Sequence, residues 1–351
     1  MADVGVNAMH FGATSEAKEA LDDALTIMGG TVTSPELFNS IMALGGAEKA
    51  KVFKGEPHER ALCFLYRGLL YLEEGDLDNA RACFKEAELQ DVRLEGDSTV
   101  AGYWLSLRCL QAFANSLDPY CAQMDFPADI PDGLAVGTLD RGDDTVLLVA
   151  SGLCPIKIQE EVKKGKYGLS YRPLPSDVGS VCVRGTEAVR QDGADLPIEA
   201  KDGGIPVRLM NPTEDIYIQA VSRGRREMDK VLEAKKRRAL AAEGHATVGE
   251  TVAQVSSQFG VWALPVTVVA VVATMSEREK AAKADSVADL RQLSSIPGSL
   301  YVVFLNSSEL ADRKVRLEAL DPGGRVLCAR EVVIPKAASS RPNVIVARVC
   351  R

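Results

Sequence analysis

The feature that most constrains the fold is a stretch of two apolar-periodic runs separated by a single turn. Residues 61–87 read ALCFLYRGLLYLEEGDLDNARACFKEA, and the turn falls at Glu74-Gly75-Asp76. On both sides of the turn, apolar residues recur at the three- and four-residue spacing of a helix. A glycine just past the last periodic residue is typical of a helix end. The stretch therefore predicts a pair of helices that pack against each other.

Small and aromatic residues within this pair follow the pattern of a 34-residue tetratricopeptide repeat. The matching positions are Gly68, Tyr71, Gly75, Ala80, Phe84 and Ala87. Small residues let two helices approach closely, and we expect Tyr71 and Phe84 to fill the space beside them. The repeat is imperfect, because Arg67 stands where a leucine is usual and Val92 where a proline is usual. A single repeat cannot cover its own apolar face, so further helices should stack on it.

Three more segments show helical periodicity near this pair. They are residues 15–30, which end at Gly29-Gly30, a short segment at 34–44, and residues 98–116, whose apolar stripe includes Trp104 and Phe113. We therefore expect a helical, tetratricopeptide-like domain at 1–120, with a scaffold role slightly favoured over a peptide groove.

Past residue 120 the pattern changes to a linker rich in proline and glycine, at 121–143, and then to short β-type runs. The runs are 146–150, 178–183, 205–209, 216–221, 300–305, 314–319, 325–334 and 344–349, separated by turn residues. Between the fourth and fifth runs lies a helical insertion at about 222–292. The sequence predicts an α+β protein whose region 144–351 is a β-sandwich-like domain interrupted by a helical segment. Two separate β-domains are the alternative.

Charge and cysteine usage exclude some classes of function. The net charge of −8 and the pI near 5.2 argue against nucleic acid as a partner, because binding to phosphates needs a basic surplus or stripe. The eight cysteines form no CxxC pair, so we expect no zinc site. We expect most of them to be reduced or to act as small buried apolar side chains.

No catalytic motif is present in the sequence. Its three histidines, His10, His58 and His245, fall in no ligand spacing, and no nucleophile motif or glycine-rich nucleotide fingerprint occurs. We therefore expect no enzymatic activity, no catalytic residues, no metal and no cofactor. Glu59 and Arg60, at the start of the repeat, are expected to be solvated or weakly paired.

Two segments of the insertion bear on membrane contact. Residues 222–238 carry eight basic residues against three acidic ones, but acids at helical pairing distance favour a solvated helix face over an anion-binding patch. Residues 251–274 have no charge, yet polar residues and Pro265 interrupt the run. A membrane span needs roughly 20 apolar residues, so a buried segment is favoured over insertion.

Three short stretches, in this order, resemble a family of uncharacterised bacterial envelope lipoproteins with an N-terminal tetratricopeptide region. They are Phe53-Lys54-Gly55-Glu56-Pro57-His58-Glu59-Arg60, Ser151-Gly152-Leu153-Cys154-Pro155-Ile156-Lys157, and Ala288-Asp289-Leu290-Arg291 with Ile296-Pro297. The chain departs from the family at Cys154, where another small residue is more usual, and it carries no lipobox cysteine at its start.

The resemblance implies an exported protein on the periplasmic side of a bacterial cell envelope, with no reaction and no cofactor. Residues 1–12 lack the pattern of a secretion signal. We expect a protein-binding, assembly or scaffold component, with a larger envelope complex or a homo-oligomer as its partner. Association with the outer membrane is expected if a lipidated signal was removed, and a cytoplasmic location is the alternative. The second functional hypothesis is a membrane-inserting or pore-like protein that uses 251–274. Tyr66, Lys157 and Arg291 are the candidate partner-binding residues.

Overall fold

The computed structural model describes residues 1–28, 53, 55–92, 104–121, 139–140, 142–163, 166–174, 176–185, 208–210, 212–220, 290–310, 314–335 and 341–350. The predicted helix at 34–44, most of the linker at 121–143 and the segments 222–242 and 251–274 lie outside these residues. What is described is an α+β fold, as predicted.

The N-terminal third of the chain forms a layer of helices in its described part. Their bounds are α1 Ala2–His10, α2 Thr14–Met28, α4 Pro57–Glu74, α5 Leu77–Val92 and α6 Leu105–Leu117. The sequence did not predict α1. The predicted helix at 98–116 has its described part in α6, with Trp104 as the residue that precedes the first turn.

The predicted pair of helices is confirmed as α4 and α5, and its packing explains the small residues. A Cβ added at Gly68 would lie 2.4 Å from the Cε1 atom of Phe84, so only glycine permits this approach. Gly75 ends α4 with a φ of 80°, a left-handed conformation that glycine adopts without strain. Ala80, Phe84 and Ala87 are fully buried.

Two four-stranded sheets follow the helices. The first has the order β10-β1-β7-β6, with bounds β10 Asn343–Arg348, β1 Thr145–Ser151, β7 Ser299–Leu305 and β6 Glu214–Asp215. The second has the order β5-β4-β8-β9, with bounds β5 Arg208–Met210, β4 Ser180–Gly185, β8 Lys314–Leu320 and β9 Val326–Val333. β1 and β10 are parallel, and the other pairs are antiparallel.

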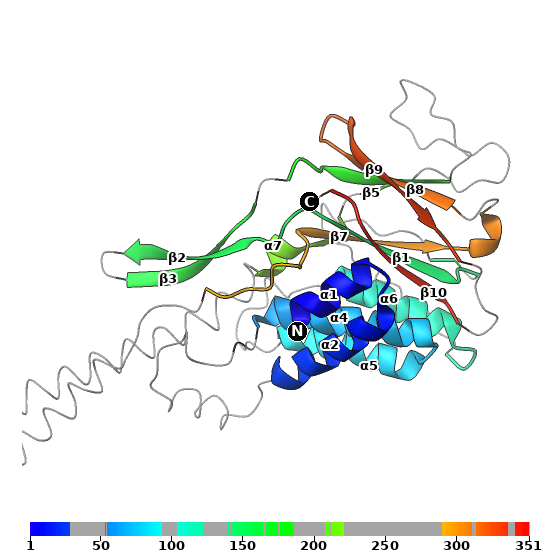
Figure 1. Ribbon diagram of the computed structural model, residues 1–351, viewed down its shortest axis with the longest axis horizontal. Coiled ribbons are helices and arrows are strands. Elements are labelled where there is room, and N and C mark those ends of the chain that lie inside the picture. The colour runs from blue at the N-terminus through cyan, green and yellow to red at the C-terminus, as the bar shows by residue number, and fades with distance from the viewer. Residues whose placement is uncertain are drawn as a thin grey trace, which may run out of the picture.

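The helices cover one face of the first sheet, and the second sheet covers the other face (Figure 1). Side chains of β1 alternate accordingly. Val146, Leu148 and Ala150 join a core that includes the helices, whereas Leu147 and Val149 join a core between the sheets. A strand buried on both faces reads as a continuous apolar run, which is why TVLLVAS shows no polar alternation. The helical layer and the first sheet therefore share one apolar core.

One predicted strand, 216–221, is wrong in its described part. The chain makes only the short strand β6 and then turns into the helix α7, Ile216–Gln219. The Asp215 carboxylate accepts a hydrogen bond from the Tyr217 amide, so it caps this helix at its first turn. An apolar run of this length does not distinguish a strand from a buried helical turn.

The sequence also missed a two-stranded hairpin, β2 Ile156–Lys163 and β3 Lys166–Arg172, which pair only with each other among the described strands. Its charged residues and glycines hide the apolar alternation of a strand.

A disulfide between Cys328 and Cys350, also not predicted, joins β9 to the residues that follow β10. None of the other six cysteines, all within the described residues, forms a disulfide, in agreement with the expectation for most of them.

Candidate functional site

The described parts of the three stretches that carry the family resemblance meet in space at the start of α4. Five of their residues, or close neighbours, form a largely buried cluster that we call the polar junction: Glu56, His58, Glu59, Lys157 and the half-buried Gln292. Segments more than 100 residues apart in sequence contribute to it. The succession of short motifs is therefore one structural unit.

The helix start organises the first side of the polar junction. Pro57 occupies the first turn of α4, where its missing N–H is no loss. The Glu59 side chain reaches back, and its Oε2 accepts a hydrogen bond of 2.6 Å from the Glu56 amide. Such a reciprocal arrangement is typical of a capping box. The Glu56 carboxylate then meets β2, and the Glu59 carboxylate meets the 290–293 segment.

Lys157, from β2, forms an ion pair with Glu56. The exposed fractions of the two side chains are only 1% and 9%, respectively. The Lys157 amide also donates to Oε1 of Gln292 at 2.6 Å, and its Nζ lies 3.4 Å from the carbonyl oxygen of Arg291. A buried charge needs such partners, because burial without them costs several kcal/mol. Lys157 thus links the helix, the hairpin and the 290–293 segment.

Glu59 is fully buried, so the expectation that it would be solvated is wrong. Its Oε1 accepts a hydrogen bond of 2.6 Å from the Leu293 amide. Burial and the nearby Glu56 carboxylate raise the pKa of Glu59 to about 7, against the opposing effect of the two backbone donors. Arg60 is also buried, because its Nε donates to Oε1 of Gln90 at 2.8 Å and its Nη1 to the Gly55 carbonyl at 2.8 Å. Hydrogen bonds from other parts of the chain, rather than from water, therefore surround the Glu59 and Arg60 side chains.

His58 lies edge-on to the ring of Tyr171 from β3, with 5.5 Å between the ring centres. Burial lowers the pKa of His58 to about 3, helped by the positive charges of Lys157 and Arg60. The imidazole is therefore neutral at physiological pH. Its Nδ1 has no hydrogen-bond partner among the described residues.

Through these contacts the polar junction holds α4, the hairpin β2–β3 and the 290–293 segment together. Lys157 and Tyr171 face each other across the hairpin, and both contact the first turn of α4. Within the described part of the chain, no three His, Cys, Asp or Glu side chains are placed to hold a metal ion. No described helix is long and apolar enough to cross a membrane.

Of the three candidate partner-binding residues, two lie at the polar junction. Lys157 is part of it, and Arg291 contributes its carbonyl oxygen while its guanidinium lies 5.5 Å from the centre of the Phe53 ring. Tyr66 lies about 10–15 Å farther along α4, given the rise of the helix. It is fully buried, lies edge-on to His10, and its hydroxyl has no partner in the part of the chain that the structure describes.

The sequence reasoning did not single out Glu56 or His58. The signal that could have found Glu56 is its spacing, since a residue that precedes Pro57 and lies three before Glu59 fits a helix start. No local signal marks His58, because its surroundings come from strands about 100 residues later.

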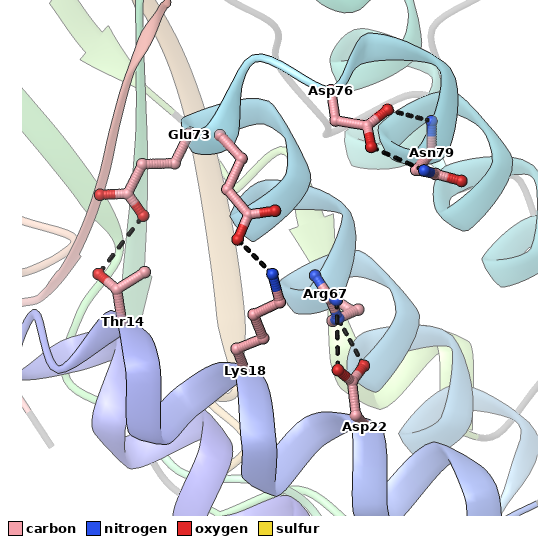
Figure 2. A network of polar contacts seen from close by, with 8 residues as sticks. Thr14, Lys18, Asp22, Arg67, Glu73, Asp76 and Asn79 are labelled. Carbon is pink, nitrogen blue, oxygen red and sulfur yellow. Dashed lines mark hydrogen bonds and ion pairs between the residues drawn. The ribbon is translucent and has the colours of Figure 1, made fainter.

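A second polar network joins α2 to α4 and provides the partners of Arg67 (Figure 2). Arg67 stands where a tetratricopeptide repeat usually has leucine, and its Nε lies 2.6 Å from Oδ1 of Asp22. The guanidinium also stacks over the Tyr71 ring at 3.8 Å. Farther along, Lys18 pairs with Glu74 at 2.6 Å. Here α2 covers α4 through polar contacts as well as apolar ones.

The hairpin β2–β3 extends from the polar junction away from the helices and the two sheets (Figure 1). Its base is buried against the rest of the chain at Lys157 and Tyr171. At the base, Ile156 is 39% exposed and Arg172 is exposed. The structure thus presents a two-stranded arm on a rigid base.

Comparison with known proteins gave no matching family model, no matching curated protein and no matching solved structure.

Proposed function

We propose that the protein is a non-enzymatic binding or assembly component, and that the hairpin β2–β3 is the element that docks its partner. The observation that carries this proposal is the arm itself, which pairs with no other described strand and extends from the body (Figure 1). A two-stranded hairpin alone is only marginally stable in water. Its outer edges carry unpaired N–H and C=O groups that a strand of another chain can bond. A partner strand paired with this arm would both stabilise the hairpin and bond its unpaired edge groups.

The polar junction supports this role because it holds the base of the arm in a fixed orientation. Lys157 on β2 pairs with Glu56, and Tyr171 on β3 packs on His58, so both strands are tied to α4. A docking element that is already oriented loses less conformational entropy on binding.

The helical layer acts, in this proposal, as a tetratricopeptide-type scaffold rather than as a peptide groove. The close contact of Gly68 with Phe84 and the left-handed Gly75 at the end of α4 support the assignment of α4–α5 as one such repeat. α4 is buried along nearly its whole length, between α2, α5 and the first sheet. The surface of α4 therefore contacts other elements of the same chain and leaves little room for a bound peptide. The two facing sheets are, in the same proposal, a β-sandwich-like unit.

We also propose an envelope location, on the periplasmic side. The Cys328–Cys350 disulfide supports it, because disulfides persist in oxidising compartments and are rare in the cytosol. The resemblance to envelope lipoproteins points to the same compartment. The partner is then another envelope protein or a second copy of this chain.

Site-specific photo-crosslinking in cells tests the docking role. A photoreactive amino acid replaces Ile156 or Arg172 at the base of the arm in the full-length protein, and crosslinked species are identified by mass spectrometry after cell fractionation. The matched control replaces Arg325, whose side chain is 81% exposed in the turn between β8 and β9. We expect a defined protein adduct from positions 156 and 172, recovered in the envelope fraction, and none from position 325. Adducts that are identical at all three positions, or absent from the arm, would contradict the proposal.

A further inference from the structure

A cavity of about 360 Å³ lies where the end of α1 and the start of α2 meet the outer edge of the first sheet. Its lining comes from several elements: Met9, His10, Phe11, Gly12, Thr14, Glu73, Arg330, Val344, Ile345 and Val346. This volume is within the range of small-ligand sites in proteins. The cavity belongs neither to the polar junction nor to the hairpin.

The most unusual residue in the lining is His10. It is only 8% exposed, and neither of its ring nitrogens has a hydrogen-bond partner among the described residues. Burial, together with the charges of Arg348 and Arg330, lowers the pKa of His10 to about 4. A neutral imidazole has one donor and one acceptor, and buried polar groups of this kind normally find partners. His10 lines the cavity, so these unpartnered nitrogens lie close to any ligand bound there.

The strand β10 contributes hydrogen-bonding groups of its backbone. It is the outermost strand of its sheet, and only β1 pairs with it among the described strands. The Asn343 and Val349 amides both donate toward the β1 side, to the Asp144 and Ala150 carbonyls. Because successive residues of a strand alternate, the backbone groups of Val344 and Val346 point to the free edge. Both residues line the cavity.

Charges of opposite sign complete the lining. Arg330 reaches across from β9, and its Nη1 donates to the Arg348 carbonyl at 3.3 Å. Glu73 lies on α4, where its Oε2 accepts from the Thr14 hydroxyl at 3.4 Å (Figure 2). Arg330 and the unpaired His10 suit a carboxylate, and Glu73 suits an N–H donor. Met9, Phe11 and the valines of β10 supply apolar surface.

We propose that this cavity binds a short extended peptide bearing a carboxylate, which adds to the free edge of β10 as a strand. The peptide backbone bonds the amides and carbonyls of Val344 and Val346, and its carboxylate contacts Arg330 and His10. An extended peptide supplies the alternating donors and acceptors that an edge strand lacks. This inference stands independently of the role proposed for the hairpin.

The test uses the full chain and two synthetic probes, acetyl-Val-Ala-Val with a free C-terminal carboxylate and the same tripeptide as its carboxamide. Binding is followed by NMR through the ring signals of His10, which the His10→Phe variant assigns. We expect saturable shifts with the acid and at least about tenfold weaker binding of the carboxamide, because a charge-assisted hydrogen bond is lost.

Two charge-matched variants complete the design. Arg330→Gln should weaken binding of the acid about tenfold, whereas Arg325→Gln, which removes the same charge at a distant turn, should leave it unchanged. His10 signals that do not respond up to about 10 mM acid, or equal affinities for acid and carboxamide, would overturn the proposal. An equal effect of the two arginine variants would overturn it as well, since it would show nonspecific attraction to positive charge.

Discussion

At the scale of single residues, the structure is organised by charges that it buries. Lys157, Glu56 and Glu59 are each less than a tenth exposed, and each bonds a segment distant in sequence. A buried ion pair adds little net stability compared with an apolar pair, but breaking it leaves one uncompensated charge. The polar junction therefore specifies which segments meet, more than it increases the free energy of unfolding.

The ion pair can be tested by removing one charge. Lys157→Met should lower the free energy of unfolding by roughly 3–5 kcal/mol, because the Glu56 carboxylate is left buried and unpaired. Urea denaturation measures this loss. The double variant Lys157→Met with Glu56→Gln should recover most of it. Lys18→Met, in a pair whose side chains are 41% and 37% exposed, should cost less than about 1 kcal/mol. Equal losses at the two lysines would contradict this description.

His58 gives a prediction for pH. Its pKa is lowered to about 3 in the folded protein, against 6.5 for an ordinary histidine, so the unfolded chain takes up a proton first as the pH falls. Stability should therefore decrease below about pH 6.5 and continue to decrease toward pH 3. Between pH 7.5 and 5 this one residue should account for about 2 kcal/mol.

The His58→Phe variant isolates that contribution. Phenylalanine keeps the ring contact with Tyr171 but does not titrate, so the variant should lose about 2 kcal/mol less stability than the wild type between pH 7.5 and 5. Chemical denaturation at both pH values provides the comparison. His10 should still cause a decrease in both proteins, because its pKa is also lowered. Parallel pH profiles would show that the pKa of His58 is not lowered in the folded state.

At the scale of elements, the close approach of α4 and α5 depends on one glycine. The repeat pattern predicted that Gly68 and Phe84 pack together, because α4 and α5 are neighbours in sequence and a short turn joins them. The hairpin β2–β3 could not be read in the same way. Its residues carry charges and glycines, and what buries Lys157 and Tyr171 comes from α4, about 100 residues earlier.

Gly68→Ala should separate the two helices. The added methyl group would lie 2.4 Å from the Phe84 ring, so the free energy of unfolding should fall by about 1–3 kcal/mol. Thermal and urea unfolding provide the measurement. Adding Phe84→Leu should restore part of the loss, because a smaller side chain leaves room for the methyl group. A double variant that loses as much as the sum of the single variants would contradict direct contact.

At the scale of the whole molecule, three layers and one covalent link define the arrangement. The first described strand, β1, lies beside the last, β10, and Thr145 and Asn343, which are 198 residues apart, share a hydrogen bond. The Cys328–Cys350 disulfide then ties the end of the chain to the second sheet. Closing a loop of 22 residues should stabilise the fold by about 3 kcal/mol through the unfolded state.

Thiol titration of the unfolded protein tests this link. Material isolated from an oxidising compartment should show six reactive thiols in denaturant before reduction and eight after it. Replacing Cys328 and Cys350 together with serine should leave six in both conditions and lower stability by about 3 kcal/mol. Eight thiols before reduction in the native protein would remove the support for an exported location.

The sequence by itself determined the elements whose signals are local. The paired helices at 61–87, the apolar run of β1, and the strands β7 to β10 follow from periodicity and turn residues within a few positions. It also placed three motifs in order, but not the contact between them.

Only the tertiary structure decided the surroundings of the charged residues. Glu59 and Arg60 have the same sequence signal as a solvated helix start, yet Leu293, Gln90 and Gly55 provide their hydrogen bonds. Ile216 begins a helical turn rather than a strand because the Asp215 carboxylate caps the turn and the segment packs in the helical core. Burial is a property of what packs on a residue, and those partners lie far away in sequence.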